Sequence, residues 1–169
     1  MKKKTSSKME GNFTYAYSSP LGTILLESNK DHLLSAGFKD DAATVDNNPN
    51  SVINQTILQL DDYFAGKRLH FDIPVFPSGT AFQQQVWQEL LKIPYGVTIT
   101  YLQLAKRLGN VKSIRAAASA NGKNPLAIII PCHRVVGAGG QLTGYAGGLH
   151  RKKWILEHEG KFSGNPGLF

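Results

Sequence analysis

The sequence predicts an α/β N-terminal domain, a small sheet with one helix, followed by a mostly helical C-terminal domain that contains a helix-turn-helix. Three observations predict this fold class. Residues 13–38 show the strand-and-turn pattern of a small sheet. Two Thr-x-x-Gln capping boxes, at Thr80 and Thr100, mark helix starts in the second half. Between the halves, residues 74–79 combine Pro, Gly and Ser, which is typical of a linker.

The first half contains three expected strands. They occupy residues 13–17, 23–26 and 33–38, and turn residues fill the segment 18–22 between the first two. The polar residues 39–50 predict a loop.

One helix is expected after this loop. Ser51 is its candidate N-cap and Gly66 its end, and a short extended segment, residues 69–75, follows. The apolar face of this helix consists of Ile53, Ile57, Leu60 and Phe64.

The second half is mainly helical. The helix opened by Thr80 should stop before Pro94, and the one opened by Thr100 should end at Gly109. Ser113 is the candidate cap of a third helix, residues 114–121. Helix, short turn, helix is the spacing of a helix-turn-helix, although any helical domain can contain it.

This third helix is rich in alanine. Direct readout of bases needs long side chains at several positions, and only Arg115 and Asn121 supply them. Small residues allow close approach to a groove without reading its sequence. A helix packed in the core explains the same residues equally well.

The only cysteine follows an apolar run. Residues 126–130 predict a buried strand that Pro131 ends, because proline cannot donate to a sheet ladder, so Cys132 is expected at a strand mouth. The thiolate is the reactive form of a thiol, and the adjacent His133 and Arg134 are a base and a cation that favour it. Taken alone, a lone cysteine is more often a buried structural residue, and the flanking residues reverse that interpretation.

A glycine-rich segment comes next. After a short strand at residues 135–136, six glycines lie within residues 137–148, in a spacing that fits neither phosphate-loop nor dinucleotide motifs. This segment is either a loop that approaches a flat ligand closely or a pair of tight turns. A last helix is expected over residues 150–159, with Gly160 as its stop.

Composition narrows the class. One cysteine in 169 residues excludes an intrachain disulfide and a Cys-rich zinc site, and suits a reducing compartment. The basic residues 1–11 predict a flexible tail without the apolar region of a signal peptide. No run approaches the ~20 apolar residues of a membrane span.

Charge is unevenly divided. Residues 1–89 contain 8 Lys/Arg and 10 Asp/Glu, a net −2, whereas residues 90–169 contain 11 and 2, a net +9. A basic half is typical of a protein that binds a polyanion, most often nucleic acid.

A Cys–His site needs a third group to orient the imidazole. If that group is a carboxylate of the basic half, only Glu157 and Glu159 are available, and His133 and His158 are the nearest histidines. Consecutive side chains of an extended strand point in opposite directions. Cys132 and His133 therefore interact directly only if the chain turns there, and otherwise through a water.

These residues resemble a known family. Asn124-Pro125 and the string from Ile130 to Val135, centred on Cys132, are similar to the active-site signature of the O6-alkylguanine-DNA alkyltransferases. Further motifs match in order and spacing: Gly79-Thr80, Phe82-Gln83, Val86-Trp87, Ile93-Pro94-Tyr95-Gly96, Thr100-Tyr101, Leu104-Ala105, Arg115-Ala116 and Gly144-Tyr145-Ala146-Gly147-Gly148-Leu149.

The resemblance covers roughly residues 12–161. It implies a ribonuclease-H-like N-terminal domain at residues 12–76 and a DNA-binding, alkyl-acceptor domain at residues 77–162. Tails at residues 1–11 and 163–169 flank them.

The activity that the resemblance implies is direct-reversal DNA repair. The alkyl (methyl) group of O6-alkylguanine, and of O4-alkylthymine, moves from double-stranded DNA to Cys132, irreversibly and once per protein. The family flips the nucleotide out and binds the minor groove. We expect a cytoplasmic monomer that uses no membrane, cofactor or metal; some relatives bind zinc through N-terminal cysteines, which this chain lacks.

Roles follow residue by residue from the resemblance. Cys132 is the acceptor, His133 takes its proton through a water, and Glu159 orients that histidine. Asn124 braces the active-site turn. Tyr101 lies at the phosphate of the extruded base and protonates the leaving guanine.

DNA and base contacts are implied in the same way. Arg115 occupies the place of the flipped nucleotide. The other implied DNA-binding residues are Ala116, Asn121, Gly122, Lys123 and Arg134. The implied base pocket consists of Tyr101, Tyr145, Ala146, Gly147 and Gly148. Some members have serine where this chain has Ala146, so backbone N–H groups must replace one hydrogen bond to guanine.

Two other functions fit parts of the pattern. A non-catalytic, alkyltransferase-like lesion-binding module resembles the family but lacks the cysteine, so Cys132 argues against it. A turning-over thiol hydrolase is compatible with a Cys–His–Glu site. It does not explain a basic half with helix-turn-helix spacing.

Overall fold

The computed structural model describes residues 12–42 and 45–164. The expected tail at residues 1–11, most of the expected tail at residues 163–169, and residues 43–44 of the expected loop lie outside this part of the chain.

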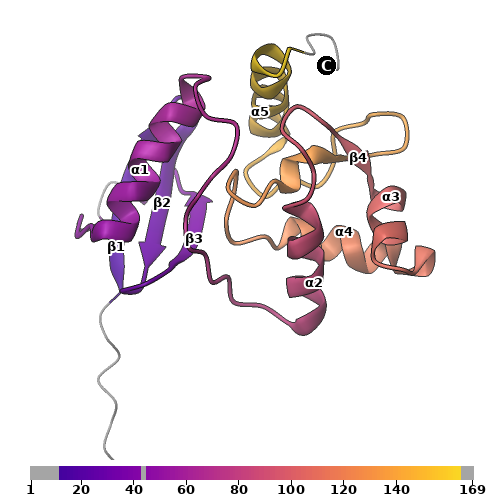
Figure 1. Ribbon diagram of the computed structural model, residues 1–169, viewed down its shortest axis with the longest axis horizontal. Helices are drawn as coiled ribbons and strands as arrows, with labels where there is room; N and C mark the ends of the chain where they lie inside the picture. The colour runs from indigo at the N-terminus through magenta and orange to yellow at the C-terminus, as the bar shows by residue number, and fades with distance from the viewer. Residues whose placement is uncertain (1–11, 43–44, 165–169) are drawn as a thin grey trace, which may run out of the picture.

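Strands and one helix form the N-terminal unit (Figure 1). The antiparallel strands β1 (Phe13–Ser19), β2 (Gly22–Ser28) and β3 (Leu33–Phe38) are hydrogen-bonded in that order. The helix α1 (Ser51–Phe64) packs its buried Ile53 and Leu60 into the same core as β2. The small sheet with one helix is thus confirmed.

The cap of α1 differs from the expectation by one residue. The N-cap is Asn50 rather than Ser51, and its side-chain oxygen accepts from the Ile53 backbone N–H at 3.0 Å. The same oxygen accepts from the Ser28 hydroxyl at 2.9 Å, which ties the start of α1 to the end of β2. Asparagine is as good a cap as serine, and this tertiary contact decides between them.

The C-terminal unit is helical, as expected. Up to residue 164, where the description ends, its α-helices are α2 (Ala81–Leu90), α3 (Tyr101–Arg107), α4 (Ile114–Gly122) and α5 (Leu149–Phe162). Both capping boxes are confirmed: Thr80 and Thr100 each accept from a backbone N–H three residues on, and the glutamine there bonds back.

Ser113 occupies the N-cap position of α4 as expected, but its side chain makes no capping bond. Its hydroxyl instead donates to Asn110 O, just before the 3₁₀ turn η2 (Val111–Ser113) that joins α3 and α4. One helix end differs from the expectation. Gly160 does not stop α5, which continues to Phe162. Phe162 covers Gly66 at the end of α1, and this packing favours one more helical turn.

The apolar run before the cysteine is not a strand, and the expected strand mouth is wrong. Leu126 makes one isolated bridge to Ala36 of β3, and the chain then turns. Cys132 opens a 3₁₀ turn, η3 (Cys132–Arg134). The short strand expected next is confirmed as β5 (Val135–Val136), which pairs in parallel with β4 (Ile99–Thr100).

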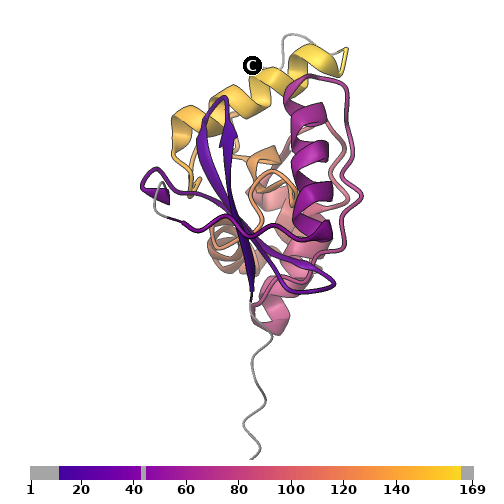
Figure 2. The same cartoon turned by 90° about the vertical axis from the view of Figure 1, so that its left-hand side faces the viewer.

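Several contacts join the two units into one core. The outer edge of β3 bridges to Val75 of the linker and to Leu126 of the C-terminal unit. Figure 2 shows α5 lying across the ends of α1 and the sheet, and the rings of Trp154 and His158 of α5 pack against Phe64 at tilted angles. The N-terminal sheet therefore supports the segment that leads to Cys132.

Candidate functional site

The turn before Cys132 is shaped by one side chain. The Asn124 amide donates to Ile130 O at 2.8 Å and to Leu126 O at 3.3 Å, and its oxygen accepts from Leu126 N at 3.0 Å. Within this turn Ile128 has φ +71°, a strained conformation for a β-branched residue. Asn124 supplies hydrogen bonds that a neighbouring strand would otherwise supply, and so stabilises the turn.

Cys132 lies at the end of this turn and is 6% exposed. Its backbone N–H donates to Ile130 O at 2.8 Å. Burial raises the pKa of the Cys132 thiol, and the nearby Asn124 amide and Lys152 ammonium oppose that rise in part. The sulfur is therefore protonated near neutral pH and needs a base to become nucleophilic.

Because the chain turns in η3 instead of extending, Cys132 and His133 do not point to opposite faces of a strand. The His133 ring is fully buried, and Nε2 lies 2.7 Å from Oε1 of Glu159. Burial lowers the pKa of His133, although the Glu159 charge opposes this. A carboxylate only accepts, so we assign the proton to Nε2. Nδ1, with no partner among the described residues, carries the lone pair.

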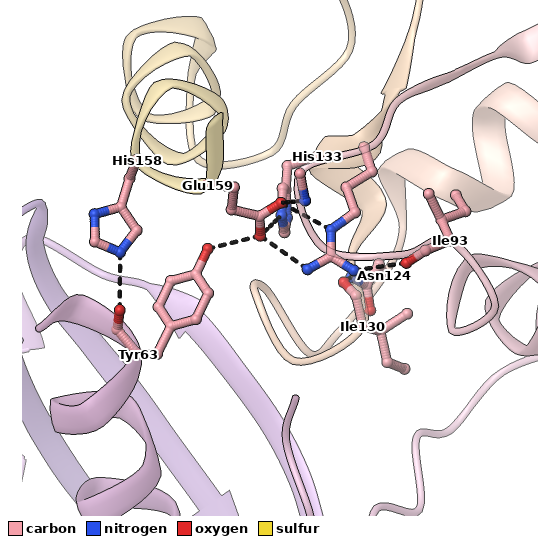
Figure 3. A network of polar contacts seen from close by, with 9 residues as sticks. Tyr63, Ile93, Asn124, Ile130, His133, His158 and Glu159 are labelled. Carbon is pink, nitrogen blue, oxygen red and sulfur yellow. Dashed lines mark hydrogen bonds and ion pairs between the residues drawn. The ribbon is translucent and has the colours of Figure 1, made fainter. Parts of the chain in front are cut away.

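Glu159 is the acid that meets His133, and Glu157 instead faces Lys153 at 3.8 Å on the surface of α5. The buried Glu159 carboxylate also accepts from Arg134, Tyr63 and the Gly96 N–H (Figure 3). Burial alone would raise the pKa of Glu159, but His133 and Arg134 hold it well below its usual range.

The structure corrects the expected DNA contact of Arg134. Its side chain is buried, with Nε and one terminal nitrogen each 2.9 Å from Glu159 and the other donating to Ile93 O at 2.7 Å. Every guanidinium nitrogen is occupied inside the protein. The positive charge balances Glu159 and is not available to a phosphate.

The expected DNA contact of Asn121 is also corrected, because this side chain is buried too. It is 1% exposed and lies on the buried face of α4, where its amide donates to Cys132 O at 3.3 Å. It supports the cysteine backbone from behind. The remaining expected DNA-binding residues are accessible: Arg115, Ala116 and Lys123 are exposed, and Gly122 is half-buried.

Tyr101, at the start of α3, meets the glycine-rich segment. Its hydroxyl donates to Thr143 O at 3.1 Å and approaches Gly144. Gly122, at the end of α4, also faces Gly144 O. The start of α3, the end of α4 and this loop therefore lie together, and we call this cluster the rim.

The expected pocket residues follow along the same loop. Tyr145 is half-buried, and its hydroxyl has no partner among the described residues. Burial, followed by the charge of Cys132, raises the pKa of this hydroxyl well above its usual value. Ala146 is exposed, Gly147 packs against Phe38 of β3, and Gly148 with φ +91° is the N-cap of α5.

Lys152 and Tyr63 were missed by sequence reasoning. The fully buried Lys152 ammonium donates to Val135 O at 2.6 Å and Thr143 O at 2.8 Å, so it joins β5 to the loop. Burial lowers its pKa to about 8, against the opposing effect of Cys132. A lysine in a charged helix gives no sequence signal of burial, and Tyr63 gave no signal of its partner 96 residues away.

Across the described ranges, no three His, Cys, Asp or Glu side chains group so as to hold a metal. None of the described helices is long and apolar enough to span a membrane.

The chain matches models of both domains of one family. The ribonuclease-like domain of the 6-O-methylguanine DNA methyltransferases matches residues 13–77, and their DNA-binding domain matches residues 81–161. The first match agrees with the fold class expected for the N-terminal unit.

Individual proteins are similar over most of their length. A methylated-DNA–protein-cysteine methyltransferase of Methanosarcina acetivorans is 44% identical over 149 residues, which cover 85% of this chain and 96% of the relative. One from Mycobacterium leprae is 45% identical over 145 residues, which cover 83% and 88%.

Solved structures agree. The Mycobacterium tuberculosis O6-methylguanine methyltransferase superposes with a TM-score of 0.80 at 38% identity, covering 89% of this chain and 94% of that one. The M. tuberculosis OGT in complex with DNA gives 0.79 at 39% identity, covering 93% and 96%. The chain therefore belongs to the 6-O-methylguanine DNA methyltransferase family.

Proposed function

We propose that this chain is a methylated-DNA–protein-cysteine methyltransferase that repairs DNA by direct reversal, with Cys132 as the acceptor. The observation that carries the proposal is the buried arrangement of Cys132, His133 and Glu159, in which Nδ1 of the imidazole has no competing partner among the described residues. The names of its relatives and the DNA complex of a similar structure support the reaction class.

The transfer is a displacement at carbon. The Cys132 Sγ–CH₃ bond forms as the O6–CH₃ bond breaks, and the bonding electron pair leaves with guanine. His133 takes the thiol proton, directly or through a water, because its Nδ1 lone pair is available. Tyr101 supplies a proton to the leaving guanine, and solvent restores both residues. Nothing at the site hydrolyses a thioether, so each protein acts once.

The lesion must leave the duplex to reach a cysteine that is 6% exposed. Base flipping costs a few kcal/mol, less for a badly paired lesion. The exposed face of α4 enters the minor groove as the second helix of a helix-turn-helix, and Arg115 fills the space of the flipped nucleotide. Small residues such as Ala116 allow close approach. The pocket accepts O6-alkylguanine and O4-alkylthymine, with backbone N–H groups near Ala146 in place of a hydroxyl.

The remaining assignments follow from the same reading. The chain works in the cytoplasm, where its free thiol stays reduced, as a monomer without cofactor or zinc. Residues 12–76 and 77–162 are its two domains.

A mass measurement tests the proposal. The protein is mixed with a duplex containing O6-methylguanine, and its intact mass is recorded. We expect one added methylene, located on the peptide that contains Cys132, and no addition in Cys132→Ala. Unmodified protein that releases product repeatedly would instead indicate a turning-over hydrolase.

A further inference from the structure

Tyr63 is the residue of the N-terminal unit whose side chain bonds to the candidate catalytic group. It lies on α1, its side chain is fully buried, and its hydroxyl donates to Oε1 of Glu159 at 2.8 Å. Figure 3 shows the ring rising from α1 toward the carboxylate that descends from α5. The other catalytic candidates all come from the C-terminal unit.

The hydroxyl shares its acceptor oxygen with His133. Oε1 of Glu159 receives His133 Nε2 at 2.7 Å, the Tyr63 hydroxyl at 2.8 Å and an Arg134 nitrogen at 2.9 Å. Arg134 also reaches Oε2, so it fixes the plane of the carboxylate as a bidentate partner. Tyr63 contacts Oε1 alone, the oxygen that orients the imidazole.

The Tyr63 ring is packed among other aromatic side chains. Aromatic rings lie around Tyr63, with centroids 5.3–6.1 Å away: Phe64, Phe71, Tyr95 and His158. The His158 ring also bonds to the Tyr63 backbone carbonyl at 2.8 Å. Burial, followed by the Glu159 charge, raises the pKa of Tyr63 well above its usual value, so the hydroxyl remains a donor at physiological pH.

We propose that Tyr63 is a positioning residue for alkyl transfer: its hydroxyl holds Oε1 of Glu159 against His133 Nε2, which keeps the imidazole lone pair on Nδ1. The inference rests on the proposed function, in which that lone pair accepts the Cys132 proton. It gives the N-terminal domain a part in the chemistry as well as in the fold.

Loss of this hydroxyl has two expected effects. The carboxylate loses a donor that restrains Oε1, so fewer molecules hold His133 in its reactive orientation and the maximal rate falls. A carboxylate with fewer donors is also the stronger proton acceptor, so imidazolium is stabilised and the pKa of His133 rises. The acid limb of the pH–rate profile then moves to higher pH.

Tyr63→Phe tests this with a matched control. Tyr17 is a second buried tyrosine of the same domain, and its hydroxyl donates to the Asp61 carboxylate at 2.7 Å, outside the site. Single-turnover methyl transfer from an O6-methylguanine duplex is measured for the wild type, Tyr63→Phe and Tyr17→Phe from about pH 5 to about pH 9. In Tyr63→Phe only, we expect a roughly tenfold lower plateau rate and an acid limb that is shifted to higher pH.

A second measurement needs no DNA. The ¹⁵N signals of the His133 imidazole are followed against pH in the unreacted proteins. We expect the Nε2–H form in the wild type and Tyr17→Phe, and a higher midpoint of protonation in Tyr63→Phe.

The two proposals fail differently. If the wild type and Tyr17→Phe do not methylate Cys132, the proposed function fails. If both methylate it and Tyr63→Phe keeps the wild-type pH profile and His133 signals, losing only stability or plateau rate, then Tyr63 is merely structural and the inference is overturned.

Discussion

At the residue scale, the site depends on a buried charge. Taking the Glu159 carboxylate out of water costs several kcal/mol, which attraction and hydrogen bonding must offset. Arg134 supplies the opposite charge, and His133, Tyr63 and the Gly96 N–H supply further donors. A hydrophobic core would cost less free energy, so the arrangement is best explained by the proposed role of His133 as a proton acceptor.

Acid should therefore lower the free energy of unfolding over two pH ranges, each because of a different residue. Below about pH 6.5 His133 becomes protonated in the unfolded chain, whereas burial lowers its pKa in the folded protein. The unfolded state then binds more protons, so the free energy of unfolding decreases as the pH decreases. Below about pH 4.5 the unfolded chain protonates Glu159 before the folded protein does, and stability falls further. Each group contributes a slope of up to about 1.4 kcal/mol per pH unit.

Glu159→Gln should remove the second of these slopes. Urea unfolding at a series of pH values gives the free energy of unfolding for the wild type, Glu159→Gln and Glu157→Gln. We expect lower stability in Glu159→Gln, with a shallower decline below about pH 4.5. Glu157→Gln should follow the wild type, because that side chain is exposed on α5 and pairs with the exposed Lys153 at 3.8 Å. A Glu159→Gln curve parallel to the wild type would contradict the prediction.

At the element scale, the two capping boxes form a natural comparison. Thr80 and Thr100 cap α2 and α3 with the same pair of bonds. Only α3 carries a candidate site residue in its first turn, because Tyr101 follows Thr100 directly and bonds to Thr143 O. Fraying of α3 would therefore displace Tyr101, whereas fraying of α2 would leave the rim intact.

Thr80→Ala and Thr100→Ala should accordingly separate stability from activity. Both are expected to lose about 1 kcal/mol of unfolding free energy, measured by urea titration. Single-turnover methyl transfer should slow severalfold in Thr100→Ala alone, once rates are corrected for the folded fraction. Equal transfer rates in the two variants would show that the start of α3 does not position Tyr101.

The same elements show what the sequence could predict. The strands, both capping boxes and the short β5 strand were predictable because their signals are local. The prediction that Cys132 lies at the end of a strand was wrong. The Asn124 side chain supplies the hydrogen bonds that residues 126–130 would otherwise make in a sheet. Within the site, counting the acids of the basic half narrowed the group that orients the histidine to Glu157 or Glu159. The positions of Tyr63 and Lys152 depend on tertiary contacts, which no local sequence pattern indicates.

At the scale of the whole molecule, the two units divide the work. The N-terminal unit, residues 12–76, contains 4 Lys/Arg and 8 Asp/Glu, a net −4, and contributes support: β3 holds the segment before Cys132, and Arg151 of α5 pairs with Asp40 at 2.6 Å while donating to Gly147 O at 3.2 Å. The C-terminal unit carries the basic excess and the exposed face of α4. Binding to any duplex should depend on the second unit alone.

This division can be measured as a salt dependence. Each neutralised phosphate steepens the slope of log affinity against log salt by about 0.9. Lys123, exposed at the end of α4, should contribute one such contact, whereas Lys30, also exposed and located between β2 and β3, should contribute none. Fluorescence anisotropy with an unmodified duplex is recorded over a salt series for the wild type, Lys123→Ala and Lys30→Ala.

We expect Lys123→Ala to bind more weakly with a slope shallower by about 1, and Lys30→Ala to match the wild type. Both variants lose one positive charge, so an effect of net charge alone would change them equally. Equal slopes in the two variants would mean that the end of α4 does not lie on the DNA. The assignment of Arg115 and Ala116 to the same DNA-binding surface would then be rejected as well.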